Sequence, residues 1–167
     1  RKKIKEITLN NSINSNASLN KIKTLNPDLL VSILGNQIFK KPLLNIAKFG
    51  CINLHTALLP KYRGLMPTFW VMKNKERFTG VSVFFVDEGI DSGEIIIQRK
   101  VLIGEKTQLQ LIKLTKRIGM ELICEAIKKI EKGDLKLIPN PENQKTYFSF
   151  PKQADVNEFL KQGNKFF

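Results

Sequence analysis

The chain has 167 residues, 42% of them hydrophobic, which is long enough for one domain with a buried core and too short for two. No stretch approaches the roughly 18 to 20 apolar residues of a membrane span, and the start Arg1-Lys-Lys-Ile-Lys-Glu6 lacks the apolar region of a secretory signal, so we expect a cytoplasmic protein without a membrane partner. The two cysteines, Cys51 and Cys124, stand in no metal-ligand spacing, which argues against a metal site and a disulfide framework.

The formal net charge of +13 raises the question of nucleic-acid binding, because clustered lysine and arginine collect phosphate. Here 23 of the 28 basic residues are lysine, and they are scattered among Asn and Ile along the sequence. This distribution is typical of a compositional bias rather than of a recognition surface. A non-catalytic basic module is therefore an alternative, and the charge also suits steering of an anionic substrate.

The first third of the chain alternates helical and extended patterns. Polar residues before regularly spaced apolar ones predict a short helix over 17–25. A nearly uninterrupted apolar run predicts a buried strand over 29–34, helical spacing predicts a helix over 39–48, and residues 50–55 have the pattern of the next strand. This order predicts two parallel strands joined by a right-handed crossover.

The remaining patterns extend the sheet and cover it. A short helix with proline in its first turn is predicted over 67–75, and strands over 80–86 and 94–101 are expected to pair as antiparallel neighbours. Helical periodicity over 108–132 predicts one long helix that Gly133 ends. Together these elements predict an α/β fold with an open, mostly parallel twisted sheet and flanking helices.

After the long helix the sequence becomes irregular. Three prolines, Pro139, Pro141 and Pro151, are expected to exclude regular structure around 146–150. A last short helix is predicted over 155–163.

Three polar side chains stand where predicted strands run into turns. Asn53 lies two residues before His55, the only histidine, and Asp91 follows His55 by 36 residues. Taken singly, each has a structural interpretation: a hydrogen-bonded histidine, a turn aspartate before Ser-Gly, and an asparagine that satisfies backbone groups. Taken together, a carboxamide, an imidazole and a carboxylate are the groups needed to move an acyl group between nitrogens.

Three motifs in one order resemble the folate-dependent formyltransferase family: Asn53-Leu-His55, Leu58-Leu-Pro-Lys-Tyr-Arg-Gly64 and Val86-Asp-Glu-Gly-Ile-Asp-Ser-Gly93. That family formylates amines with 10-formyltetrahydrofolate and has a Rossmann-like fold that begins with a βαβ portion, which we expect this chain to lack. The resemblance covers a catalytic core over 26–133. Residues 1–25 are then a partial N-terminal segment and residues 134–167 a C-terminal extension with a short helix.

The resemblance gives the three polar residues catalytic roles that agree with their chemistry. The Asn53 carboxamide is suited to stabilise the oxyanion of the formyl carbon. His55 is suited to donate to that oxyanion or to relay a proton. Asp91 is suited to orient the imidazole and to take the proton of the attacking amine, directly or through water.

Binding of the formyl donor is expected where strands end in loops, since ligands of open α/β sheets collect there. The resemblance implies that the pterin ring is read largely by backbone groups. The residues expected to contact it are Gly35, Gln37, Ile38, Val86, Asp87, Glu88 and Gly89. No Gly-rich phosphate loop or metal cluster is seen, so neither ATP nor a metal is implied.

The loop after the histidine is the predicted substrate contact, through Lys61, Tyr62, Arg63 and Gly64. Arg63 is favoured for an anionic group because guanidinium binds phosphate or carboxylate in bidentate fashion, although an ordinary surface arginine is the alternative. The family usually has serine where Ala57 stands, so a hydroxyl that braces this loop is expected to be missing.

The acceptor is left open by the sequence. Arg63-Gly-Leu-Met-Pro-Thr-Phe-Trp70 resembles the sugar N-formyltransferases and favours a small amine, such as a nucleotide-linked amino sugar. The overall resemblance also suits methionyl-tRNA as the acceptor, the one case in which we expect specific nucleic-acid binding. Formyltetrahydrofolate deformylase, a hydrolase with the same three residues, is a further alternative.

Overall fold

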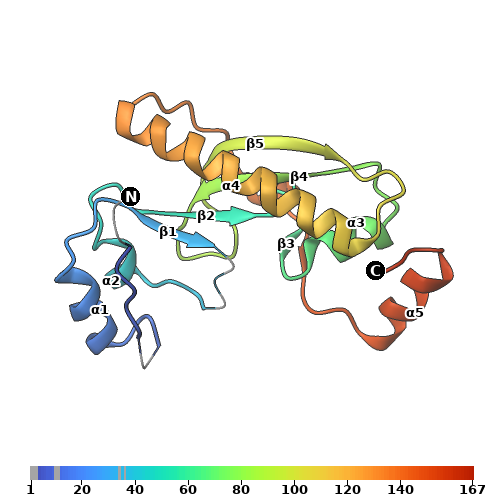
Figure 1. Ribbon diagram of the computed structural model, residues 1–167, viewed down its shortest axis with the longest axis horizontal. Coiled ribbons are helices and arrows are strands. Elements are labelled where there is room, and N and C mark those ends of the chain that lie inside the picture. The colour runs from blue at the N-terminus through green and yellow to red at the C-terminus, as the bar shows by residue number, and fades with distance from the viewer. Residues whose placement is uncertain (1–3, 10–11, 34, 36) are drawn as a thin grey trace.

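The computed structural model of the protein describes residues 4–9, 12–33, 35 and 37–167 (Figure 1). Leu34, the last residue of the strand predicted over 29–34, lies outside the described residues, as do residues 1–3, 10 and 11 of the N-terminal segment. The elements in chain order are α1 (Asn16–Lys23), β1 (Leu30–Ile33), α2 (Lys41–Leu44), β2 (Cys51–His55), β3 (Arg63–Gly64), α3 (Pro67–Lys73), β4 (Phe78–Phe85), β5 (Ile95–Leu102), α4 (Gln108–Lys132), the 3-10 helix η1 (Glu142–Gln144), β6 (Tyr147–Phe148) and α5 (Gln153–Lys161).

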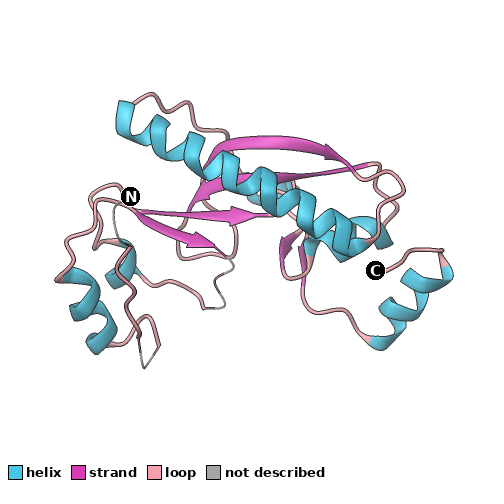
Figure 2. Ribbon diagram, in the orientation of Figure 1, coloured by secondary structure: helices cyan, strands magenta, loops and turns pink. Residues whose placement is uncertain are grey.

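Four strands form the main sheet in the order β1-β2-β4-β5 (Figure 2). β1 and β2 are parallel, as predicted, with Leu30 opposite Cys51. β4 is antiparallel to both of its neighbours, and the predicted antiparallel pairing of β4 with β5 is confirmed. The α/β class is confirmed, and over the described residues the sheet is mixed. The short loop from β4 to β5 leaves no room for the crossover that a parallel pair requires.

The predicted helices differ from the observed ones mainly at their ends. α1 begins after the cap Ser15, whose hydroxyl accepts from the backbone N–H of Ser18. α2 is a single turn, shorter than the predicted 39–48, because the chain continues after Leu44 through turns closed by backbone bonds, among them Gly50 N–H to Ala47 O. The apolar spacing in this region therefore reflects burial without a continuous helix.

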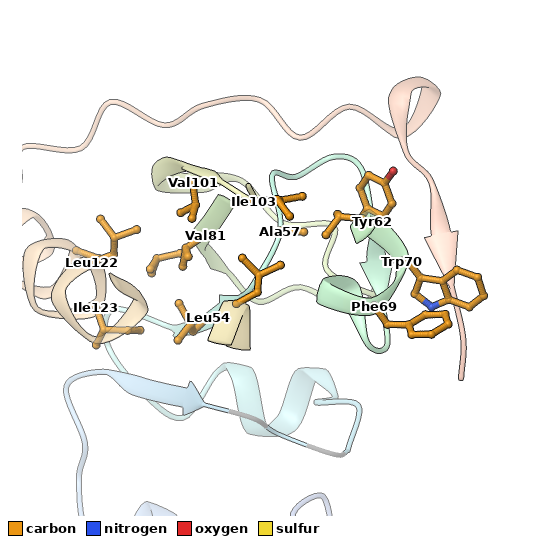
Figure 3. Packing of buried hydrophobic residues seen from close by; sticks show 14 of the residues in the cluster. Leu54, Ala57, Tyr62, Phe69, Trp70, Val81, Val101, Ile103, Leu122 and Ile123 are labelled. Carbon is orange, nitrogen blue, oxygen red and sulfur yellow. The ribbon is translucent and has the colours of Figure 1, made fainter. Parts of the chain in front are cut away.

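The long helix α4 lies across one face of the sheet (Figure 2) and contacts β2, β4 and β5. Thr107 and Gln110 form a capping box at its start, and Gly133 ends it with a φ of 67°. Figure 3 shows Leu122 and Ile123 of α4 facing Leu54 and Val81 of the sheet. None of the described helices combines the length and apolarity needed to cross a membrane.

The C-terminal extension packs back onto the core. β6 pairs in parallel with β3, and Trp70 Nε1 donates to Ser149 O at 3.0 Å. Phe159 of α5, fully buried, stacks on Phe69 at 4.8 Å between ring centroids. The prediction that prolines exclude regular structure over 146–150 is wrong, because two residues between Pro141 and Pro151 suffice to pair with the short strand β3.

Charged groups also attach this extension. Arg63 is 3% exposed, and its guanidinium forms an ion pair with Glu142, which Lys145 also contacts at 2.6 Å. Hydrogen bonds from Lys145 and Arg63 lower the pKa of Glu142 to about 2. The folded-state pKa therefore lies below that of the unfolded chain, so Glu142 stabilises the fold most above pH 4.5 and loses this effect as the pH falls toward 2.

We expect Leu122→Ala to lower the free energy of unfolding by about 2 to 5 kcal/mol, because the fully buried side chain leaves a cavity between α4 and the sheet. Met120→Ala is the matched control on the same helix, since Met120 is 47% exposed and its loss should cost less than about 0.5 kcal/mol. Denaturant unfolding measures both. Equal effects of the two substitutions would contradict the assigned core.

We expect Glu142→Gln to lower the Tm at pH 6 to 7, because it leaves the buried Arg63 without its anionic partner. The Tm difference from the unsubstituted protein should shrink as the pH falls from about 4.5 toward 2. Thermal unfolding followed by circular dichroism across this range gives the measurement. Glu105→Gln is the control, since Glu105 is exposed and forms no ion pair within the described part of the chain. A pH-independent difference for Glu142→Gln would rule out the linkage.

Candidate active site

The three polar side chains singled out from the sequence are brought together at one end of the sheet. Asn53 and His55 are two residues apart on β2 and so project from the same face of the strand. Asp91 lies in the loop between β4 and β5, and its Oδ2 is 3.5 Å from His55 Nδ1. Asn53 and Asp91 line a common cavity of about 320 Å³. His55 does not line this cavity and is 6% exposed.

Both ring nitrogens of His55 face an oxygen. Nε2 lies 2.7 Å from the backbone carbonyl oxygen of Tyr62, and Nδ1 faces the Asp91 carboxylate. A carbonyl oxygen only accepts, so Nε2 carries a hydrogen in this arrangement. Nδ1 then faces the Asp91 carboxylate, and the two form an ion pair only when the imidazole is protonated. The imidazole thus has an oxygen at each edge, and its Nδ1 edge faces Asp91.

The Asp91 carboxylate is itself held in place. Asp91 has a φ of 48°, in the left-handed region that aspartate tolerates better than most residues. Its Oδ2 accepts a hydrogen bond from Gly64 N–H at 2.8 Å. Gly64 has a φ of 94°, and a Cβ there would meet Phe148 O at 2.2 Å, so only glycine fits between β6 and the Asp91 loop.

Asn53 has an amide oxygen, Oδ1, that is buried without a hydrogen-bond partner among the described residues. A buried amide group without a partner is costly, and such costs are typically retained where a ligand completes the bonding. Asn53 also lines the cavity, so its carboxamide is available to a bound group.

Six of the seven residues predicted to contact the formyl donor line this same cavity: Gly35, Gln37, Ile38, Val86, Asp87 and Gly89. Glu88 does not line it and instead pairs with Lys41 at 2.9 Å. Asp87 shapes the loop, because its Oδ1 accepts hydrogen bonds from Gly89 N–H and the Ser92 hydroxyl. The described residues contain no group of three or more His, Cys, Asp or Glu side chains placed to bind a metal ion.

The predicted substrate contacts divide into two groups. Gly64 lines the main cavity, and Lys61 is exposed at a second cavity of about 250 Å³. Tyr62 is 8% exposed and its hydroxyl donates to Glu76 at 2.8 Å. Burial raises the pKa of the Tyr62 hydroxyl to about 12. Its side chain therefore serves packing in this structure.

Arg63 is not free to meet an anionic substrate, contrary to the prediction. Its Nη2 donates to the side-chain and backbone oxygens of Asn140, at 2.9 and 3.1 Å, while Nη1 pairs with Glu142. The prediction is wrong because the partners lie in the C-terminal extension, 77 and 79 residues further along the chain. Neither the surface-arginine alternative nor the anion-binding one describes this buried contact.

The loop after His55 is braced without the serine that the sequence comparison expects at Ala57. The Ser82 hydroxyl donates to Ala57 O at 2.6 Å and accepts from Leu59 N–H at 3.2 Å. Gln98 Nε2 adds bonds to Leu59 O and to Ser82 Oγ. Hydroxyl and amide groups of β4 and β5 thus replace a local brace.

Sequence reasoning missed the polar residues of the C-terminal extension that reach the site. Asn140 Nδ2 donates to Asp91 O and Gly93 O, both at 2.9 Å, and Thr146 Oγ1 accepts from Tyr62 N–H at 2.8 Å. These residues stand among prolines in a stretch without periodicity, and no spacing connects them to the earlier motifs. Their neighbours give no signal either, since Asn140 stands between two prolines and Thr146 between Lys145 and Tyr147.

Comparisons with known proteins agree on one family. A formyl transferase family model matches residues 3–127. Methionyl-tRNA formyltransferase of Synechococcus sp. (strain JA-2-3B'a(2-13)) is 39% identical over 137 residues, which cover 81% of this chain and 42% of that protein. The chain spans about two fifths of the length of the curated relatives that it matches.

Solved structures of sugar N-formyltransferases share the fold. PseJ from Anoxybacillus kamchatkensis, solved with UDP-4,6-dideoxy-4-formamido-L-AltNAc and tetrahydrofolate, has 25% identity and a TM-score of 0.68 over 94% of this chain and 76% of its own. The N-formyltransferase from Helicobacter canadensis, solved with folinic acid and dTDP-3-aminofucose, has 27% identity and a TM-score of 0.64 over 76% of this chain and 46% of its own. Because the family model covers most of the sequence, the chain belongs to the formyl transferase family.

Proposed function

We propose that this chain is the catalytic core of an enzyme that transfers a formyl group from 10-formyltetrahydrofolate to a primary amine. The observation that carries the proposal is the placement of Asp91 between His55 and a cavity that Asn53 also lines. Family membership supports the reaction class. The two sugar N-formyltransferase neighbours, both solved with reduced folates, support the donor.

In this proposal the Asn53 amide stabilises the negative charge that develops on the formyl oxygen when the amine nitrogen attacks the formyl carbon. Asp91 accepts the proton that the attacking amine releases, directly or through a water molecule. That proton then goes to the folate nitrogen as the bond from the formyl carbon to this nitrogen breaks. No other reactant is required.

His55 supports this proton transfer through its contact with the Asp91 carboxylate. Its Nε2 hydrogen is committed to the Tyr62 carbonyl, so only the Nδ1 edge responds when Asp91 gains or loses a proton. The imidazole next to Asp91 orients the carboxylate that accepts the amine proton. In this geometry His55 acts on the reaction through Asp91 rather than by direct donation to the formyl oxygen.

The folate is proposed to bind in the cavity of about 320 Å³, whose lining includes Gly35, Gln37 and Ile38 together with Val86, Asp87 and Gly89. The apolar contacts of this cavity include Ile38, Phe84 and Val86, which suit a flat ring. We expect backbone groups of the lining residues Val86, Asp87 and Gly89 to contact the edge of this ring.

The acceptor proposed first is methionyl-tRNA, because the methionyl-tRNA formyltransferase of Citrifermentans bemidjiense is 41% identical to this chain over 119 residues, against 25% for PseJ and 27% for the Helicobacter canadensis enzyme. The Arg63 to Trp70 pattern that favoured a sugar loses weight, since Arg63 and Trp70 both bond to the C-terminal extension. A nucleotide-linked amino sugar is the second candidate, favoured by the shared fold with PseJ.

The test supplies the complete protein with 10-formyltetrahydrofolate and one acceptor at a time: methionyl-tRNA, a nucleotide-linked amino sugar, or water alone. We expect a formylated amine and stoichiometric tetrahydrofolate only where the amine is correct. Release of formate that no amine accelerates would instead identify a deformylase. Calorimetric binding of RNA without any binding of a stable formylfolate analogue would favour the basic module.

We expect Asp91→Asn to lower turnover by about 10²- to 10⁴-fold with little change in folate affinity. The asparagine oxygen still accepts from Gly64 N–H, so the loop geometry is kept while the proton acceptor is lost. Steady-state kinetics and calorimetry give the two quantities. Asp134→Asn, at an exposed position outside the site, is the control. Full turnover of Asp91→Asn at saturating substrates would reduce Asp91 to a turn residue.

A further inference from the structure

Asn140 connects the C-terminal extension to the loop that carries Asp91. Its side-chain NH2 group donates to two backbone carbonyls of that loop, Asp91 O and Gly93 O, each at 2.9 Å. Asn140 lies beyond residues 3–127, the part of the chain that the family model matches. No role in the site follows for it from the motifs.

The other atoms of Asn140 bind the neighbouring strand. Its side-chain oxygen and its backbone oxygen both accept from the buried Arg63 guanidinium. Arg63 directly precedes Gly64, whose N–H donates to the Asp91 carboxylate. These hydrogen bonds form a closed ring. Asn140 bonds to the backbone of Asp91, and Arg63 bonds to Asn140. Gly64, the residue after Arg63, completes the ring through its bond to the Asp91 carboxylate.

Only a carboxamide satisfies every partner in this ring. Two carbonyl oxygens require a group with two N–H donors, and the guanidinium requires an acceptor at the other end. An aspartate would serve Arg63 and fail both carbonyls. The ring matters because Asp91 adopts a left-handed φ of 48°, a conformation that persists only where surrounding contacts impose it.

We propose that Asn140 is a positioning residue for the reaction: it sets the Asp91 loop so that the carboxylate faces both His55 and the cavity. Its catalytic meaning rests on the proposed function, whereas the geometry it imposes on the pair of His55 and Asp91 does not. Reactive groups displaced by about 1 Å typically lose on the order of 10²-fold in rate. The effect should therefore fall mainly on kcat, because Asn140 itself does not line the cavity proposed for the donor.

Three substitutions distinguish the role of the Asn140 side-chain N–H donors from that of its oxygen acceptor. Asn140→Asp keeps the acceptor for Arg63 and loses both donors, Asn140→Leu loses donors and acceptor without adding charge, and Asn140→Gln keeps both on a longer stem. Asn157→Asp is the control, since it makes the same chemical change on the exposed side of α5, where Asn157 bonds only to Gln153 among the described residues.

Activity is measured in the complete protein as kcat, KM for the formyl donor and the pH profile of kcat. We expect Asn140→Asp and Asn140→Leu to lower kcat by about 10- to 100-fold with a nearly unchanged KM for the donor and a displaced pH profile. Asn140→Gln should recover part of the loss, and Asn157→Asp should match the unsubstituted protein.

A second readout does not depend on activity. The imidazole nitrogen signals of His55, assigned by their loss in His55→Gln, should move in the NMR spectra of Asn140→Asp and Asn140→Leu and stay in place in Asn157→Asp. If the unsubstituted protein transfers no formyl group, the proposed function fails while these spectra still decide the positioning claim. Unmoved His55 signals together with normal kcat in both variants would overturn it. Where one of these two variants does not fold, the other is compared with Asn140→Gln, which should have the higher kcat and the smaller displacement of the His55 signals. Equal kcat and equal signals in that pair also overturn the proposal.

Discussion

The site depends on the imidazole of His55 being held between two oxygens, the carbonyl of Tyr62 and the carboxylate of Asp91. A carbonyl is a fixed acceptor, so it assigns one hydrogen of the ring and leaves the opposite nitrogen to respond to Asp91. The elements around the site place the imidazole and these two oxygens next to one another. β2 delivers the ring, the loop after β2 turns back to present Tyr62 O, and the loop after β4 presents Asp91.

The two residues that provide these oxygens, Tyr62 and Asp91, have an uncommon backbone conformation. Tyr62 and Asp91 both have positive φ, at 60° and 48°, although neither is glycine. Contacts from the C-terminal extension oppose this strain: Thr146 accepts from Tyr62 N–H, and Asn140 donates to Asp91 O. The extension therefore acts as a brace for the two strained residues that hold the imidazole, and the pairing of β3 with β6 aligns it.

The separation in sequence between two interacting residues decides whether their contact could be predicted from the sequence. The capping box at Thr107 and the terminating Gly133 are local, so the bounds of α4 were predictable to the residue. Asn53 and His55 share a face because side chains of a strand alternate, which makes their approach predictable as well. Arg63 resisted prediction because its partners lie 77 and 79 residues away in a proline-rich stretch without periodicity. Sequence patterns report local periodicity, and this contact has none.

In the proposed reaction, an anionic acceptor has to be bound by groups other than Arg63, because Arg63 bonds to Asn140 and Glu142. A guanidinium committed to Asn140 and Glu142 cannot also form a bidentate contact with a phosphate. Beside it, Lys61 is exposed, and 23 of the 28 basic residues of the chain are lysines. Lysine offers a mobile point charge, which attracts phosphate from a distance and discriminates little between phosphate-bearing ligands. Within the proposed function, the exposed lysines of this chain are therefore suited to attracting a phosphate-bearing acceptor, whereas the buried Arg63 guanidinium is held by Asn140 and Glu142.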